Sequence, residues 1–333
     1  MKLRQQQQYR ISYTTNTRGG WEGDPFIGMS EARDVGFRYV EVFGASFCAR
    51  SSGFGRRTSA GRGPLEPQKV WPDGYTYVPP KTQPPHEVYY PNDWEALDHR
   101  IYEIGVQFTA VTGGAAGEST AFEDPAQRDA VVNNHFNMAR FSRRFGCDHQ
   151  KTNTGERRPE GTSQEDLKNI ALTLEQLGKR IKEELGMPFG VHAHLGSQIQ
   201  NQNEIDYVME NTHPDHVYFV LDTGHITMAG MDPIALSKKL GSRVVEYHLK
   251  DTAPEDRGGT KHAPPRTRNM MNDPYFYPLG SGGVDFPALI GYLDSTEWRG
   301  HLTVELDASP WRPAKASAQI THNYIRDVLK LSF

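Results

Sequence analysis

Short apolar runs alternate with longer amphipathic stretches along most of the chain. Between the runs, apolar residues recur at helical spacing, most clearly at 124–145 and 163–185. Near-continuous apolar strands are typical of parallel sheets that are buried on both faces. Eight strands are predicted in this way, at 9–13, 39–43, 107–111, 148–153, 189–194, 217–222, 243–248 and 302–305. Eight alternating strand and helix units predict an α/β fold, a single (β/α)8 TIM barrel domain over residues 1–333.

Capping residues mark several predicted helix boundaries. The helix at 124–145 is expected to begin with Asp124 as its N-cap and Pro125 in its first position. The helix at 163–185 is expected to have Thr162 or Ser163 as its cap. Further helices are expected at 203–211, 232–240, 285–293 and 314–331. A glycine precedes six strands, where we expect it to end a helix in the left-handed conformation: Gly36, Gly105, Gly146, Gly186, Gly241 and Gly300.

Two long segments interrupt the alternation, residues 51–91 after the second strand and 252–283 after the seventh. Both follow the C-terminal end of a strand, so we expect them to be loops that lie over the mouth of the barrel. The first is rich in aromatic residues, among them Trp71, Tyr75, Tyr77, Tyr89 and Tyr90. Such side chains suit stacking on a sugar ring or an aromatic leaving group, and a contact between subunits of a homo-oligomer is the alternative.

Charge and composition exclude several kinds of partner. Lys and Arg number 37 against 41 Asp and Glu, and no dense basic run occurs, so nucleic acid is not an expected partner. No stretch approaches the roughly 20 apolar residues of a membrane span, so no membrane association is expected. The two cysteines, Cys48 and Cys147, form no disulfide framework. The chain is therefore expected to work in a reducing cytoplasm.

Four of the predicted strands end at residues that bind metals. The fifth ends at His192 and His194, the sixth at Asp222, the seventh at His248 and the eighth at Glu305. In a (β/α)8 barrel the functional groups lie where the strands end, at the C-terminal mouth. We therefore expect two histidines and two carboxylates to converge on one divalent ion.

The segments 191–200, 204–210, 221–233, 247–251 and 304–307 resemble the xylose-isomerase-like TIM barrel superfamily. Within it they are most similar to inosose dehydratases and to the proteins called sugar phosphate isomerases/epimerases. The resemblance is dense from about Gly190 to Asp251 and returns in the last strand. The first half of the chain is similar only in its alternation of strands and helices. The resemblance implies a metal-dependent enzyme that acts on a small sugar or keto-polyol.

The resemblance also implies a ligand set. Family members hold one divalent cation with Glu, Asp, His and Glu on strands five to eight, which correspond here to His192, Asp222, His248 and Glu305. The chain departs from the family at strand five, where His192-Ala-His194 replaces the Glu. Alternation puts both imidazoles on one face of the strand, so either can ligate. We assign His192 to the metal and His194 to the substrate. Mn²⁺ is the first candidate ion, with Co²⁺, Mg²⁺ or Zn²⁺ as alternatives.

The departure at strand five bears on the reaction. Epimerases of the superfamily use the glutamates of strands five and eight as an acid/base pair, and here only Glu305 remains. We therefore expect a carbon-oxygen lyase that dehydrates a keto-polyol or cleaves a keto-glycoside by β-elimination. His194 is the expected base. Lys151 is expected to hold an oxyanion or donate a proton, with a barrel-mouth salt bridge as its alternative.

Two other functions stay open. One is a sugar isomerase or epimerase that uses the same metal site, and the other is a non-catalytic carbohydrate-binding barrel. Residues expected to contact the substrate lie at strand ends: Glu41, Asn153, His225, Lys250 and Asp251. For His225 the alternative is capping of the next helix, and for Asp251 a structural role in the loop. Five histidines outside this pattern are expected at the surface or at helix edges: His149, His213, His216, His262 and His301.

Overall fold

The computed structural model describes residues 8–21, 25–44, 94–113, 120–253 and 275–333. Eight strands close into one barrel in the order β1-β10-β7-β6-β5-β4-β3-β2, and every neighbouring pair is parallel. The barrel strands are β1 (Tyr9–Thr14), β2 (Tyr39–Phe43), β3 (Gln107–Thr112), β4 (Gln150–Thr152), β5 (Phe189–His192), β6 (Tyr218–Asp222), β7 (Val244–Leu249) and β10 (Gly300–Val304). The predicted (β/α)8 barrel is confirmed, with each strand close to its expected position.

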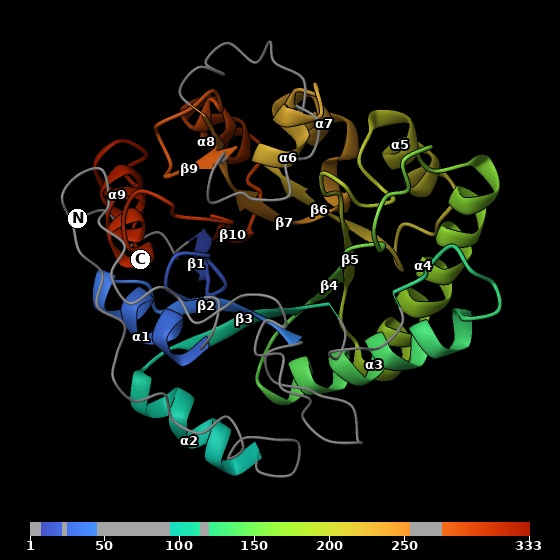
Figure 1. Cartoon of the computed structure of the whole chain (residues 1–333), viewed down its shortest axis with the longest axis horizontal. Helices are drawn as coiled ribbons and strands as arrows, with labels where there is room; N and C mark the ends of the chain where they lie inside the picture. The colour runs from blue at the N-terminus through green and yellow to red at the C-terminus, as the bar shows by residue number, and fades with distance from the viewer. Residues whose placement is uncertain (1–7, 22–24, 45–93, 114–119, 254–274) are drawn as a thin grey trace.

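The helices lie around the outside of the strands (Figure 1). They are α1 (Pro25–Val35), α2 (Trp94–Ile104), α3 (Arg128–Arg144), α4 (Gln164–Leu185), α5 (Gln202–Glu210), α6 (Thr223–Met228), α7 (Pro233–Leu240), α8 (Phe286–Ser295) and α9 (Ala314–Asp327), with a 3₁₀ turn, η3 (Gly241–Arg243). The strands β5, β6 and β7 are buried along nearly their whole length, which explains their apolar sequence. Among the described helices, none is long and apolar enough to cross a membrane.

The boundaries of α4 follow the predicted capping residues. The Ser163 side chain accepts a hydrogen bond from the backbone of Asp166, whose carboxylate accepts one from the backbone of Ser163. Gly186 ends the helix in the left-handed conformation, with φ of 65°. The reciprocal cap satisfies two backbone N–H groups that have no partner within the helix. Local sequence is therefore sufficient to fix both ends of α4.

Two other predicted boundaries were wrong. Asp124 does not cap α3, because its carboxylate accepts the backbone N–H of Ala126 and holds a separate turn before the helix. Gly300 does not end a helix, since it is the first residue of β10. It packs against the ring of Trp298, which would lie 2.5 Å from an added Cβ atom. This glycine is needed for close packing and not for a left-handed turn.

The structure describes part of one predicted insertion and none of the other. Residues 51–91 fall among those that the structure does not describe. The described ends of the second insertion form a small antiparallel sheet of β8 (Asp251–Thr252) and β9 (Phe276–Tyr277). The Asp251 carboxylate accepts backbone N–H groups of Gly280 and Gly282 at 2.8 and 2.9 Å. A Cβ atom on Gly282 would lie 2.0 Å from the carbonyl oxygen of Thr252, so the loop packs tightly against β8.

Candidate metal centre and active site

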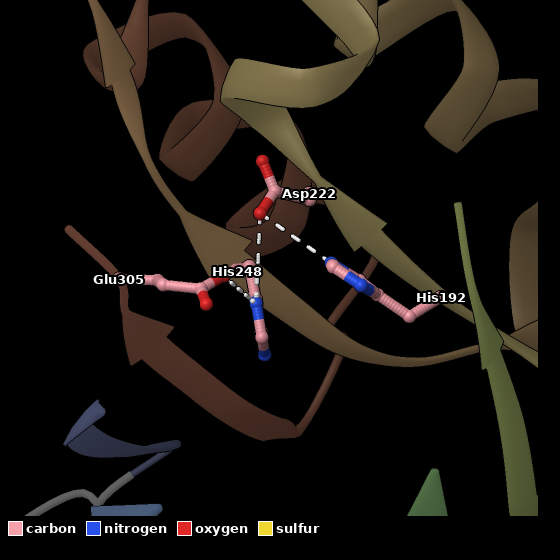
Figure 2. Close-up of side chains that lie close together, drawn as sticks. All are labelled: His192, Asp222, His248 and Glu305. Atoms are coloured by element: carbon pink, nitrogen blue, oxygen red, sulfur yellow. Dashed lines mark hydrogen bonds and ion pairs between the residues drawn. The ribbon is translucent and has the colours of Figure 1, made fainter. Parts of the chain in front are cut away.

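The four predicted ligands converge at the C-terminal mouth of the barrel (Figure 2). His192, Asp222, His248 and Glu305 come from β5, β6, β7 and the end of β10, and each offers a ligand atom within 4.8 Å of the others. Asp222 Oδ2 lies 3.4 Å from His192 Nε2 and 3.6 Å from His248 Nδ1. His248 Nδ1 lies 2.7 Å from Glu305 Oε2. All four side chains are buried.

Asp222 has two tasks, one for each carboxylate oxygen. Oδ1 accepts the backbone N–H of His225 at 2.9 Å and caps the short helix α6. Oδ2 faces the imidazoles of the cluster. Burial raises the pKa of Asp222, but Lys250 and His225 lower it well below the ordinary value overall. The position of His225 in a helix was not predicted, and its backbone, not its side chain, makes the capping contact.

His192 is held so that one nitrogen is directed at the cluster. Its Nδ1 lies 2.8 Å from the amide oxygen of Asn153, so Nδ1–H donates and Nε2 keeps its lone pair. Burial lowers the pKa of His192 to about 4, although Asp222 opposes the shift. A neutral imidazole oriented from behind is the form that binds a metal. The geometry thus places His192, and not His194, in the ligand cluster, and uses Asn153 to orient it.

His248 connects the mouth to a second polar cluster deeper in the barrel. Nδ1 faces Glu305, whereas Nε2 lies 3.2 Å from Glu41 Oε2 and also contacts Lys151 Nζ. Burial and Lys151 lower the pKa of His248, but Glu41 and Glu305 raise it well above the ordinary value. For Nδ1 to bind a metal, Nε2 must carry a proton and needs an acceptor. Glu41 is that acceptor.

The donor set fits one divalent ion. Two imidazoles, each held from its far nitrogen, and two carboxylates face one point, which is a ligand set used by first-row transition metals. Magnesium is the least suited of the four candidates, because it prefers oxygen ligands and retained waters.

Lys151 and Glu41 lie below the mouth and not at its open side. Both are 0% exposed, and Lys151 Nζ contacts Glu41 and lies 2.6 Å from Glu246 Oε2. Glu41 also accepts a hydrogen bond from Thr112 at 2.7 Å. The structure therefore favours the salt-bridge alternative for Lys151, and it buries Glu41 in the same ion pair. Glu246 was missed, although its position two residues before His248 on the same face of β7 was a readable signal.

His194 is the partly exposed imidazole beside the ligand cluster. Its Nδ1 lies 2.7 Å from the carbonyl oxygen of Leu195, so Nδ1–H donates and Nε2 is left as a proton acceptor. Burial and Lys250 lower the pKa of His194, which keeps the ring neutral. The rings of His194 and His225 lie 3.7 Å apart between centroids. His194 is thus a neutral, partly exposed imidazole with Nε2 available to accept a proton.

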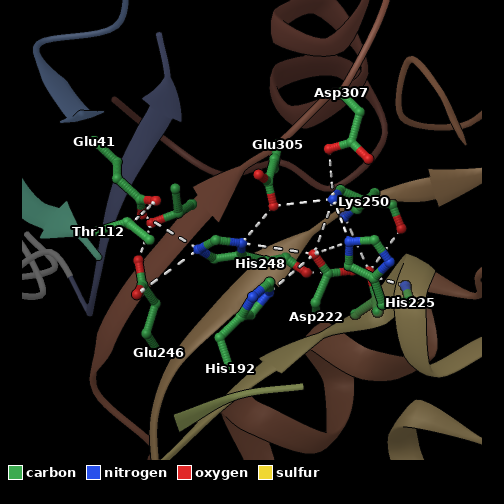
Figure 3. A network of polar contacts seen from close by, with 12 residues as sticks. Glu41, Thr112, His192, Asp222, His225, Glu246, His248, Lys250, Glu305 and Asp307 are labelled. Carbon is green, nitrogen blue, oxygen red and sulfur yellow. Dashed lines mark hydrogen bonds and ion pairs between the residues drawn. The ribbon is translucent and has the colours of Figure 1, made fainter. Parts of the chain in front are cut away.

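Lys250 and Asp307 complete the described part of the mouth (Figure 3). Lys250 is 0% exposed, and its Nζ lies between Asp307, Glu305, Asp222 and His225. It is therefore covered by other side chains and not presented at the surface as a substrate contact. Asp307 was not predicted as a site residue. Its position two residues after Glu305 was the feature of the sequence that could have identified it. Asp251 lies outside this cluster, with its carboxylate bound to the loop after β9.

The expected surface positions of His149 and His301 were wrong, since both are buried at the N-terminal ends of β4 and β10. His149 lies 2.9 Å from Asp148 through Nδ1 and 3.0 Å from Glu246 through Nε2. His301 Nε2 lies 2.9 Å from the same Asp148. Strands β4 and β10 are opposite each other in the barrel order, so these side chains meet across its floor. Among the other three, His213 is exposed, His216 is partly buried, and His262 lies outside the described residues.

The closed parallel barrel, with its ligand cluster at the C-terminal strand ends, places the chain among the (β/α)8 TIM barrels. More specifically, the chain belongs to the xylose isomerase-like TIM barrel family, which matches residues 73–328.

Curated relatives and solved structures agree with this assignment. The chain is 34% identical over 150 residues to an inosose dehydratase of Clostridium tetani, which is 45% of this chain and 50% of the relative. An inosose dehydratase of Salmonella typhimurium is 32% identical over 159 residues, covering 47% and 52%. The chain thus spans about half the length of the curated relatives it matches. A sugar phosphate isomerase/epimerase from Parabacteroides distasonis has a similar fold, with a TM-score of 0.64, 13% identity and coverage of 99% and 98%.

Proposed function

We propose that this chain is a divalent-metal-dependent carbon-oxygen lyase that acts on a keto-sugar or keto-polyol. The observation that carries the proposal is the convergence of His192, Asp222, His248 and Glu305 beside a neutral, partly exposed His194. The similarity to inosose dehydratases supports a dehydration or a related β-elimination. Mn²⁺ is the proposed ion, since two imidazoles and two carboxylates suit a first-row transition metal.

The bound ion supplies a Lewis acid that polarises a carbonyl or hydroxyl oxygen of the substrate and acidifies the adjacent C–H bond. His194 Nε2 takes that proton, because Nδ1–H is engaged with Leu195. The electron pair of the C–H bond forms the new C=C bond as the β C–O bond breaks. The leaving oxygen is protonated, and water, an alcohol or a phenol is released. We assign this second proton transfer to the imidazolium of His194, which then returns to its neutral state.

Deuterium labelling tests the reaction class. The metal-loaded protein is incubated in D₂O with a panel of inososes and 3-keto-glycosides, and the products are followed by NMR and mass spectrometry. A lyase releases water, an alcohol or a phenol and leaves an unsaturated ketone or its hydrate. A stoichiometric isomer with deuterium at carbon and no released group would contradict the lyase and favour the isomerase or epimerase. Ligand binding without turnover, by a protein free of tight metal, would favour a carbohydrate-binding barrel.

A further inference from the structure

The ammonium group of Lys250 lies among atoms that ordinarily bind metals (Figure 3). Its Nζ is 2.8 Å from His225 Nε2 and 2.9 Å from Asp307 Oδ1. It is also 3.0 Å from Glu305 Oε2 and 3.3 Å from Asp222 Oδ2. The last two belong to the ligand cluster described above. One imidazole nitrogen and three carboxylate oxygens thus surround a single fixed positive charge, two of them shared with the neighbouring metal centre.

A second group of metal-type donors lies at the same place. His194, His225 and Asp307 each offer a ligand atom, and these atoms lie within 4.8 Å of one another. Lys250 Nζ contacts two of the three, His225 and Asp307. Because Lys250 is 0% exposed, its ammonium cannot turn out into solvent without repacking its surroundings. The ammonium therefore occupies the position that a second divalent ion would take.

The net charge of the side chains that contact Lys250 also matches a single divalent ion. Among the described residues in contact with Lys250, three carboxylates, Asp222, Glu305 and Asp307, face one ammonium, which leaves two negative charges. One divalent cation neutralises them. A second divalent ion would lie against the ammonium without a counter-charge, and like charges this close in a buried site repel strongly.

We propose that Lys250 is a built-in cation at the second position of a two-cation site, and that it limits the mouth to one divalent ion. The inference rests on the metal centre of the proposed function. It concerns how many ions bind and not which reaction follows. Removal of the ammonium leaves three carboxylates and the His194 and His225 imidazoles, which is a complete ligand set for a second ion. The chemical class of that ion is the same borderline first-row class, and Zn²⁺ is a suitable probe.

The test counts ions per chain. The protein is stripped with a chelator and titrated with Zn²⁺ by calorimetry, and the dialysed product is analysed for metal. The parent should bind one ion tightly, and Lys250→Met should bind two, with its first ion held at least ~10-fold more tightly because a repelling charge is gone. The control is Lys239→Met, which removes a surface ammonium paired with Asp206 and should leave the count at one.

A double variant distinguishes charge balance from a structural role. Lys250→Met combined with Asp307→Asn removes one positive and one negative charge, and it should return the count to one with an affinity near that of the parent. It also covers the case in which Lys250→Met alone fails to fold, since circular dichroism can establish that the balanced variant is folded. In that case a count of two for the double variant contradicts the proposal.

The outcomes separate this inference from the proposed function. A parent that binds one ion and a folded Lys250→Met variant that still binds only one, with unchanged affinity, would overturn the role of Lys250 and leave the metal centre standing. A parent that binds no ion would overturn both. A parent that binds two tight ions would overturn the limiting role alone.

Discussion

The mouth and the floor of the barrel are built from the same kinds of residue, yet His192 at the mouth and His149 at the floor differ in charge. At the floor, burial lowers the pKa of His149, but Glu246 and Asp148 raise it to about 9, so the ring is an imidazolium at neutral pH. At the mouth, burial lowers the pKa of His192 to about 4, so that ring is neutral. The first imidazole lies between two carboxylates, whereas the far nitrogen of the second faces an amide oxygen.

This difference decides what each end can do. In the deeper cluster, the carboxylates of Glu41 and Glu246 are paired with the ammonium of Lys151 and the imidazolium of His149. This network of buried ion pairs links β2, β4 and β7 inside the barrel. At the mouth, His192 and His194 are neutral, and the three carboxylates around Lys250 outnumber its ammonium, so a cation completes the charge balance. The partners of each histidine, more than the number of histidines, separate a structural network from a binding site.

The largest expected effect follows from loss of a mouth ligand. Asp222→Asn should lose the metal and reduce turnover by about 10³-fold or more, since Lewis-acid stabilisation is worth several kcal/mol. The matched floor variant is Asp148→Asn, whose partly exposed carboxylate does not contact the mouth, and it should keep both metal and turnover. Metal analysis and kcat measurements on both variants check this. Equal loss in the floor variant would break the distinction between the two ends.

Removal of the base should separate binding from chemistry at the mouth. His194→Ala is expected to keep its metal and lose roughly two to four orders of magnitude in kcat, the usual contribution of a positioned general base. The exposed His213→Ala serves as the control and should retain kcat. Loss of metal from His194→Ala would show that His194 is a ligand, which was the alternative for strand five.

Glu41 lies between the mouth and the deeper cluster, so variants at this position test how far the metal centre depends on that cluster. Glu41→Gln should weaken metal affinity by about 10- to 100-fold, because the Nε2–H of His248 then has a neutral amide oxygen in place of the carboxylate as its acceptor. Glu246→Gln should have a smaller effect on affinity, since its Oε2 lies 3.8 Å from His248 Nε2. Calorimetric titration of both variants measures the difference. If Glu246→Gln weakened binding more than Glu41→Gln, the proposed tautomer control by Glu41 would be wrong.

Changes at the floor, such as deprotonation of His149, should affect the stability of the fold and leave the reaction unchanged. The folded pKa of His149 is raised to about 9 from an unfolded value of about 6.5, so its contribution is fully present below pH 6.5 and is lost as pH rises through 9. Between pH 7 and 9 the free energy of unfolding should fall by about 2 kcal/mol. Urea unfolding across this range measures the slope, and His149→Gln should flatten it. A pH-independent free energy of unfolding in the parent would contradict the assignment.

The sequence was sufficient for the barrel and for the four side chains that converge at its mouth, because both depend on where the strands lie. Apolar runs locate β5, β6 and β7, and the residues at their ends must meet at one edge of a parallel barrel. The sequence did not predict the directions in which side chains point or the partners that they contact. The fourfold contact of Lys250 joins residues 25 to 57 positions away, and the burial of His301 depends on a strand from the opposite side of the barrel. Only the closed fold determines such contacts.

The two oxygens of Asp222 join the candidate metal centre to α6, a buried helix of 6 residues. Helix α6 depends on Oδ1 for its N-terminal hydrogen bond, while Oδ2 faces the ion. The same helix carries the His225 ring against His194, so the wall of the mouth is positioned by a metal ligand. We expect an ion that fixes the orientation of this carboxylate to protect the amide of His225 from exchange with solvent as well. Slow hydrogen exchange in α6 would then report occupancy of the centre from the backbone alone.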